Sequence, residues 1–283
     1  MNIQILPGLK SIQHKYQAFL VDVWGVLHDG QDLYPYALDC LEQLRENQKK
    51  VVIISNAARR HDTIIEELVN LGIDRSLYHG VASSGELVWQ SIQRQEIQTV
   101  RQKGYYLGPL RSRSLLDGLV VNWVEQLEDA DFILNAGAIE GNSKDTSGYD
   151  VLLNTASQLD LPMICANPDM VAVRVGELGI SAGAIAERYR QLGANQIEFY
   201  GKPFALIYQL ALALLDNPYH EKVLAIGDAY ATDIVGAGNM GLDSYLIAAG
   251  IHHQDLNPLS LAALELTAAG LPLPNYASEY FQW

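Results

Sequence analysis

Short apolar runs alternate along most of the chain with longer stretches in which apolar residues recur at helical spacing. The runs that suit strands buried on both faces are residues 18–21, 51–54, 222–226 and 244–248. The stretches with helical spacing between them are residues 37–48, 63–71 and 204–215. Repeated strand, helix, strand order predicts an α/β fold, in which a parallel sheet carries helices on both faces.

This alternation changes between residues 83 and 196. Strand-like apolar runs occur at residues 118–121, 131–136 and 163–165, but polar loops and turns separate them. A segment of this length is the size of a small independent domain. We therefore predict a core domain made of residues 1–82 and 197–283, with an α/β domain inserted at residues 83–196.

Composition and charge disfavour several classes of partner. The formal net charge of -14 disfavours nucleic acid and anionic membranes, although a local positive site could still hold a small anion. Cys40 and Cys165 are too few and too far apart for a disulfide framework or a zinc site, which is typical of a reducing cytoplasm. Pro7 and Gly8 interrupt the N-terminal segment where a signal peptide needs an unbroken apolar core. We expect a soluble, cytoplasmic protein.

Polar residues stand where several of the predicted strands end. Asp22, Ser55 and Asp228 each follow a buried-type strand, and Asp233 comes shortly after Asp228. Ligands of parallel sheets bind at the carboxyl ends of the strands, and a buried carboxylate is costly unless a partner, a metal or chemistry keeps it there. Each acid taken alone also fits a turn residue, and Lys202 alone fits a solvated surface lysine. Their occurrence together favours a functional site.

The combination suits phosphoryl chemistry. Two or three carboxylates bind Mg2+, an ion that prefers oxygen ligands together with phosphate and water. With the metal in place, Asp22 could attack phosphorus beside Asp228 and form an aspartyl phosphate. Ser55 and the backbone N–H of Asn56 could hold phosphate oxygens. Lys202 could neutralise the charge that builds up in the transition state.

Four short segments carry a resemblance to a known family. DVWGV at Asp22, ISN at Ser55, GKP at Lys202 and GDAYATD at Asp228 resemble, in this order, the four motifs of the haloacid dehalogenase (HAD) superfamily of hydrolases. The insertion between the second and third segments, together with NPD at Asn167, resembles the NagD-like class IIA branch. The resemblance covers nearly the whole chain.

The resemblance implies a Rossmann-like core with an inserted cap, and Mg2+ as the cofactor. It implies that Asp22 is the nucleophile and a metal ligand, with Asp228 and the backbone carbonyl of Trp24 as further ligands. The other implied roles are orientation of nucleophile and phosphate by Lys202, phosphate binding by Ser55 and Asn56, support of the metal ligands by Asp233, and selection of the leaving group by Asn167 and Asp169. A homodimer formed through the cap is consistent with the resemblance.

One position departs from the family pattern. Phosphatases of this family usually carry a second Asp two residues after the nucleophile, where it protonates the leaving oxygen and then activates water. Here that residue is Trp24, whose indole does not exchange a proton near neutral pH. General acid–base catalysis contributes roughly 100- to 10,000-fold in rate. His28 is the nearest substitute acid, because imidazole titrates near neutrality, and an ordinary turn residue is the alternative interpretation.

Three functions fit these observations. The first, which we favour, is an Mg2+-dependent phosphatase that acts through an aspartyl phosphate on a small phosphorylated metabolite such as a sugar phosphate or a nucleotide monophosphate. The second keeps the aspartyl phosphate but hydrolyses it slowly or transfers the phosphoryl group to another acceptor. The third is a catalytically weak protein of the same fold that binds a phosphorylated ligand.

Overall fold

The chain divides into two compact units in a computed structural model that describes residues 3–141, 144–174, 177–250 and 270–283. The first unit comprises Met1–Ser55, Ile64–Ala82 and Lys202–Trp283. The second unit comprises Asn56–Thr63 and Ser83–Gly201. The chain therefore leaves the first unit and returns to it, so the second unit interrupts the first in sequence.

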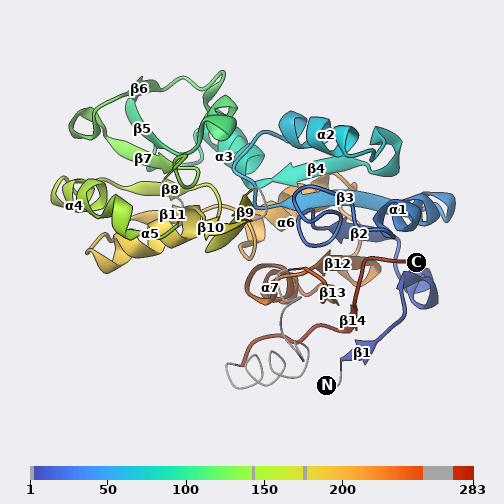
Figure 1. Cartoon of the computed structure of the whole chain (residues 1–283). Helices are drawn as coiled ribbons and strands as arrows, with labels where there is room; N and C mark the ends of the chain where they lie inside the picture. The colour runs from blue at the N-terminus through green and yellow to red at the C-terminus, as the bar shows by residue number, and fades with distance from the viewer. Residues whose placement is uncertain (1–2, 142–143, 175–176, 251–269) are drawn as a thin grey trace. The chain divides into compact units, whose positions relative to one another are not determined.

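The first unit is built on a seven-stranded sheet with the strand order β1-β14-β13-β12-β2-β3-β4 (Figure 1). Its strands are β1 (Gln4–Ile5), β2 (Ala18–Val21), β3 (Lys50–Ser55), β4 (Gly80–Ser83), β12 (Val223–Gly227), β13 (Asp243–Ile247) and β14 (Tyr276–Ser278). The central strands β13, β12, β2 and β3 run parallel to one another. Every residue of β2 and β12 is buried, which explains why both are continuous apolar runs.

Among the described residues, four helices belong wholly or largely to this unit. They are α1 (Ala37–Glu46), α2 (His61–Asn70), α6 (Ala205–Ala213) and α7 (Val235–Asn239). Helices α1 and α6 pack against β3, and α7 packs against β13. In α1 the buried residues Ala37, Cys40, Leu41 and Leu44 recur at helical spacing, so the helix buries one apolar stripe. The α/β prediction with a parallel sheet is confirmed.

The second unit has its own five-stranded sheet with the order β11-β8-β7-β5-β6, in which the neighbouring strands are parallel. Its strands are β5 (Lys103–Leu107), β6 (Asn122–Val124), β7 (Phe132–Asn135), β8 (Met163–Cys165) and β11 (Ile197–Phe199). An antiparallel hairpin of β9 (Val171–Arg174) and β10 (Glu177–Ile180) and the helices α3 (Ser84–Gln93), α4 (Asp150–Gln158) and α5 (Ala182–Gln191) complete it. Buried Tyr149 and Tyr189 belong to its apolar core.

Two details of the second unit differ from the sequence analysis. The run at residues 118–121 is not a strand: the strand β6 lies just after it, and Val120 is 97% exposed. Strand β11, which we grouped with the core, pairs with β8 in the second sheet. Ile197 and Phe199 pack against the second unit's apolar cluster. The sequence of such a short strand does not indicate which of two sheets the strand will join. The core and cap boundaries at residues 82/83 and 196/197 stay a prediction.

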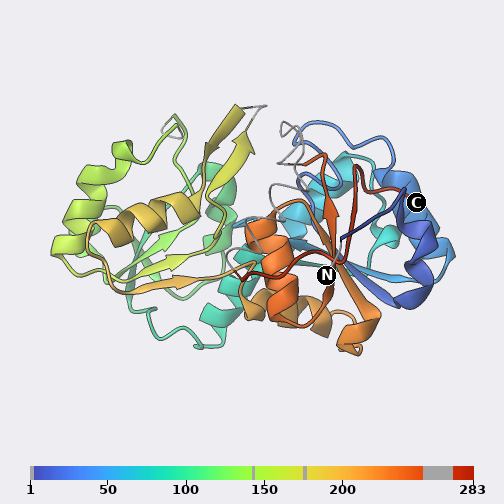
Figure 2. The same cartoon turned by 90° about the horizontal axis from the view of Figure 1, so that it is seen from below.

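The two ends of the chain close one edge of the first sheet. Strands β1 and β14 pair in parallel near the two chain ends that Figure 2 marks N and C. The backbone N–H of Leu9 donates a 2.9 Å hydrogen bond to the carbonyl of Gln282. Phe281 is 1% exposed. The hydroxyl of Tyr16 donates to Asp243 Oδ2 at 2.6 Å, and burial together with this carboxylate raises the pKa of Tyr16. The aromatic C-terminal segment is therefore an integral part of the core.

No helix among the described residues has both the length and the apolar character that a bilayer crossing requires. Cys40 and Cys165 are both buried free thiols, as expected of small apolar residues in a core.

We predict that Phe281→Ala destabilises the first unit. Removing a buried aromatic side chain costs about 3–5 kcal/mol because of lost burial and the remaining cavity. Thermal unfolding followed by circular dichroism should show a clearly lower midpoint. Val120→Ala, at a position that is 97% exposed, is the control and should unfold like wild type. Equal midpoints for the two variants would show that the C-terminal segment does not contribute to stability.

Candidate active site

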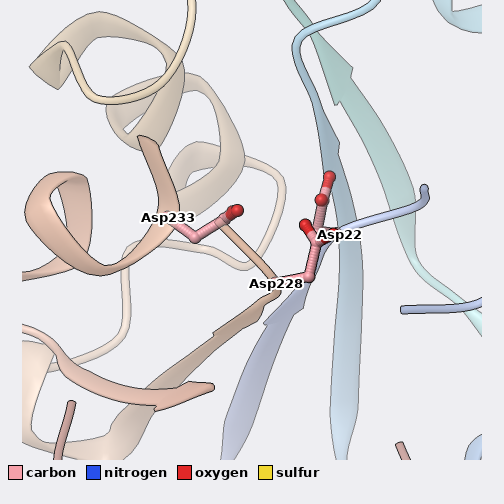
Figure 3. Close-up of side chains that lie close together, drawn as sticks. All are labelled: Asp22, Asp228 and Asp233. Carbon is pink, nitrogen blue, oxygen red and sulfur yellow. The ribbon is translucent and has the colours of Figure 1, made fainter. Parts of the chain in front are cut away.

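Two carboxylates project from the ends of neighbouring strands. Asp22 directly follows β2, and its backbone N–H donates a 2.9 Å hydrogen bond to the carbonyl of Ile226 in β12. Asp228 directly follows β12. Because β2 and β12 are hydrogen-bonded neighbours in parallel register, the two acids come together at the carboxyl edge of the sheet (Figure 3). Both are buried, with 7% and 3% exposure.

Asp233 supplies a third buried carboxylate from a helical turn. It lies in the π-helical turn Tyr230–Ile234 that follows β12, and its Oδ2 accepts a 3.2 Å hydrogen bond from the backbone N–H of Ala229. The hydroxyl of Tyr208 in α6 lies 3.3 Å from the carbonyl oxygens of both Thr232 and Asp233 and holds the turn against that helix. Asp22, Asp228 and Asp233 each offer an oxygen within 4.8 Å of the others.

Lys202 places one positive charge among these acids. Its Nζ lies 2.7 Å from Asp22 Oδ1 and 2.8 Å from Asp233 Oδ1, and the side chain is only 3% exposed. Burial raises the pKa of Asp233 to about 6, since it outweighs the opposing effect of the Lys202 ammonium, and the negative charge of Asp22 adds to the rise. One lysine among three acids leaves a net negative charge in a buried place.

These residues fit a divalent metal ion. Carboxylate oxygens are the donors that Mg2+ prefers, and a cation would offset the excess negative charge. The backbone also fixes Asp228: a Cβ atom at Gly25 would lie 1.9 Å from Asp228 Oδ2, and one at Gly250 would lie 2.2 Å from it. Positions 25 and 250 can therefore hold only glycine, because a Cβ atom at either would overlap the Asp228 carboxylate. The ligand role of the Trp24 carbonyl stays a prediction.

Ser55 lies at the same edge of the first sheet as Asp22. It is the last residue of β3, which pairs in parallel with β2, and it is 9% exposed. The carboxyl ends of β2, β3 and β12 thus contribute Asp22, Ser55 and Asp228, as the strand pattern indicated. The phosphate-binding role of Ser55 stays a prediction.

The other predicted site residues come together in the second unit. Asn56 Nδ2 donates a 2.8 Å hydrogen bond to Asp169 Oδ1, and the Ser84 hydroxyl donates to Asn56 Oδ1 at 3.3 Å. The backbone N–H of Asp169 donates to Asn167 Oδ1 at 2.9 Å, which makes the NPD segment an Asx turn. Residues more than a hundred positions apart in sequence thus form one polar network. Its connection of Asn56 to Asp169 was not foreseen from the sequence.

A second polar cluster was also missed. The buried carboxylate of Glu86 pairs with Arg60 Nε at 2.7 Å and with His61 Nδ1 at 2.8 Å, and it accepts from Gln90 Nε2 at 2.9 Å. These contacts hold the 56–63 segment on α3. The sequence contained a signal only for the start of α3, because Ser83 followed three residues later by Glu86 is a capping-box pattern. In the structure, the Glu86 N–H donates a 3.1 Å hydrogen bond to Ser83 Oγ.

Trp24 and His28 are joined through the backbone. The Gly25 N–H donates a 2.9 Å hydrogen bond to the carbonyl of His28, so the loop after Asp22 folds back on itself. The Trp24 indole nitrogen is buried and has no hydrogen-bond partner among the residues that the structure describes. His28 Nδ1 accepts the Gly30 N–H at 2.9 Å, which suits a neutral imidazole with its proton on Nε2. The role of His28 as an acid stays a hypothesis.

We predict that Gly25→Ala weakens divalent-metal binding by about 10-fold or more, the range for changes that displace the surroundings of a metal ligand. The added methyl group would displace the Asp228 carboxylate. Gly72→Ala is the matched control: both glycines have positive φ, at 79° and 95°, but a Cβ at Gly72 would meet nothing within 4 Å. Calorimetric titration with Mg2+ measures both. Equal affinities would contradict the proposed place of the metal.

Comparisons with known proteins agree with this geometry. Residues 19–121 match the family model described as haloacid dehalogenase-like hydrolase, and residues 199–264 match a second HAD-hydrolase-like model. The chain is 24% identical over 237 residues to an acid sugar phosphatase of Staphylococcus epidermidis, covering 83% of this chain and 88% of that one. It is 21% identical over 240 residues to the 5'-nucleotidase YutF of Bacillus subtilis, with coverages of 83% and 88%.

A solved structure extends the similarity over nearly the whole chain. It is a haloacid dehalogenase-like hydrolase from Brucella suis, with a TM-score of 0.85 and 27% identity over 97% of this chain and 99% of that one. The two family matches lie on either side of most of the second unit and include Asp22, Ser55, Lys202 and Asp228. The superfamily expected from the four motifs is confirmed, and the chain belongs to the haloacid dehalogenase-like hydrolases.

Proposed function

We propose that the protein is an Mg2+-dependent phosphatase that acts through an aspartyl phosphate on a small phosphorylated metabolite. The observation that carries this proposal is the buried cluster of Asp22, Asp228 and Asp233, in which the Lys202 ammonium pairs with Asp22 and Asp233. The relatives named acid sugar phosphatase and 5'-nucleotidase support a sugar phosphate or a nucleotide monophosphate as the substrate. The NagD-like branch and a homodimer formed through the cap remain predictions.

In this proposal Asp22 is the nucleophile. A carboxylate oxygen of Asp22 forms a bond to phosphorus while the bond from phosphorus to the leaving oxygen breaks, and the electron pair leaves with that oxygen. Water then attacks the aspartyl phosphate, which releases inorganic phosphate and restores the carboxylate. Lys202, fixed between Asp22 and Asp233, orients the nucleophile and offsets negative charge on the phosphoryl group.

Asp22, Asp228 and the Trp24 carbonyl would hold the Mg2+ ion, with Asp233 supporting them. The bound ion would lower the repulsion between the carboxylate and the phosphate dianion. Ser55 and the N–H of Asn56 would bind phosphate oxygens. In the second unit, Asn167 and Asp169 would select the leaving group, as part of the inserted cap domain.

Trp24 favours the alternative functions in which hydrolysis is slow or absent. Without an acid at this position the leaving oxygen departs unprotonated, so esters with poor alkoxide leaving groups react slowly. A protein of this kind could hydrolyse slowly, transfer the phosphoryl group to another acceptor, or only bind a phosphorylated ligand. The proposed phosphatase accommodates Trp24 on sugar phosphates and nucleotide monophosphates if another group, with His28 the nearest candidate, supplies the proton.

We predict Mg2+-dependent release of inorganic phosphate from 4-nitrophenyl phosphate, abolished by EDTA and by Asp22→Asn. The amide cannot act as the nucleophile, so release should fall by at least about 1,000-fold, as when a nucleophile acting with its partners is removed. Asp216→Asn is the control, because that side chain is 89% exposed and pairs only with Lys50 among the described salt bridges. A variant at Asp22 that retained wild-type release would contradict the covalent mechanism. Retained binding of phosphate with no release in wild type would favour the binding alternative.

We predict that Trp24→Asp raises turnover of alkyl phosphates, whereas Trp24→Asn does not. The two variants have similar size, but only the carboxyl group can donate a proton, and that help is worth roughly 100- to 10,000-fold. Steady-state rates on glycerol phosphate measure the effect, and circular dichroism checks that both variants fold. Equal rates for the Asp and Asn variants would show that the missing acid does not limit the reaction.

A further inference from the structure

Ser84 and Asn56 are two buried polar residues of the second unit whose side chains are hydrogen-bonded. Ser84 is the first residue of α3 and is 0% exposed, and Asn56 is 3% exposed. The Ser84 hydroxyl donates to Asn56 Oδ1 at 3.3 Å, and Asn56 Nδ2 donates to Asp169 Oδ1 at 2.8 Å. The hydrogen bonds thus run in one direction, from hydroxyl to amide to carboxylate, so Ser84 reaches Asp169 through Asn56.

The orientation of the Asn56 amide follows from these two contacts. An ionised carboxylate only accepts hydrogen bonds, so the NH2 end of the amide faces Asp169 and the carbonyl end faces Ser84. If the amide were turned over, its oxygen would face a carboxylate oxygen, and two acceptors repel each other. A hydroxyl that donates to Oδ1 therefore favours the orientation in which Asn56 holds Asp169.

The backbone at Gly201 packs directly against this pair of side chains. A Cβ atom at this position would lie 2.2 Å from Ser84 Oγ, 2.6 Å from Asn56 Oδ1 and 2.7 Å from Pro168 Cδ. The hydroxyl, the amide and the NPD turn therefore meet at one place, which only a residue without a side chain can border. Packing this close leaves the Ser84 hydroxyl and the Asn56 amide little room to move.

The backbone of the NPD turn is held separately, at the start of α5. The Gly183 N–H donates to the Asp169 carbonyl at 3.1 Å, and a Cβ atom at Gly183 would lie 2.2 Å from the Pro168 carbonyl oxygen. The Asp169 N–H donates to Asn167 Oδ1. These contacts hold the peptide groups of the turn, whereas the Asn56 contact reaches the carboxylate itself.

We propose that Ser84 is a positioning residue for leaving-group selection: it fixes the Asn56 amide, which holds the Asp169 carboxylate in place to accept hydrogen bonds from the leaving group. This inference rests on the proposed phosphatase function and adds a residue to it. An acceptor that is held in place before binding loses less conformational entropy than a mobile one. Ser84 therefore affects the binding of a leaving group with hydroxyl groups and not the attack of Asp22 on phosphorus.

The test measures how two compounds inhibit phosphate release from 4-nitrophenyl phosphate. Glycerol phosphate carries hydroxyl groups that can donate to Asp169, whereas inorganic phosphate has no leaving group. Ser84→Ala should raise the inhibition constant of glycerol phosphate by about 2- to 12-fold, the range for one lost hydrogen bond. The inhibition constant of inorganic phosphate and kcat for 4-nitrophenyl phosphate should keep their wild-type values.

A double-mutant cycle tests whether Ser84 acts through Asp169. Asp169→Ala should also raise the inhibition constant of glycerol phosphate, and adding Ser84→Ala to it should have no further effect. Ser84→Cys keeps a weak donor and should lie between wild type and Ser84→Ala. Ser91→Ala is the matched control, because Ser91 is also a buried serine of α3, and it should behave like wild type. Circular dichroism checks that each variant folds.

Three results would overturn the positioning role and leave the proposed phosphatase intact. They are an unchanged constant for glycerol phosphate in Ser84→Ala, equal changes for both inhibitors, and additive losses in the double variant. Wild-type protein that glycerol phosphate does not inhibit would overturn it as well. Absence of Asp22-dependent release from 4-nitrophenyl phosphate would instead overturn the proposed function, and with it the role of Ser84.

Discussion

The site in the first unit depends on one buried ammonium group. Lys202 Nζ is within hydrogen-bond distance of both Asp22 and Asp233, and all three side chains are almost fully buried. Two carboxylates this close would repel each other strongly in a place with little water, so the shared cation makes their positions tolerable. Lys202 is also the first residue of the first unit after the chain returns from the second. The residue at which the chain re-enters the first unit is therefore also the cation that pairs with Asp22 and Asp233.

The strand order of the first sheet places the carboxylates of Asp22 and Asp228 together. Because β2 and β12 are adjacent and parallel, the residues just beyond them occupy one edge, and the carboxylates of Asp22 and Asp228 lie together there. The close approach of Gly25 and Gly250 then restricts Asp228 to one place. A negatively charged, rigid group of oxygens is the arrangement that a divalent cation would complete. In this fold, the metal and the lysine would share the task of compensating three acids.

The leaving-group side of the proposed reaction is where this chain differs from its family pattern. Trp24 offers no proton, and the loop that carries it continues to Tyr34, which contacts the backbone beside Gly250. The same loop carries Tyr34 and Tyr36, whose rings each lie 5.9 Å from that of Tyr280. In the second unit, the hydrogen bond of Asn56 to Asp169 ties the segment after Ser55 to the NPD turn.

The parallel α/β architecture and the strand ends that carry Asp22, Ser55 and Asp228 could be predicted from the sequence alone. Buried parallel strands are continuous apolar runs, so the polar residues that follow them are easily recognised. The resemblance to the family motifs also predicted that Trp24 stands where an acid is usual. Three contacts could be seen only in the folded chain: Lys202 lies between two acids, β11 joins the second sheet, and the rings of Tyr34 and Tyr280 are in contact. Those contacts join residues up to 246 positions apart (280 - 34), and local periodicity reports what a segment buries but not which distant segment it is buried against.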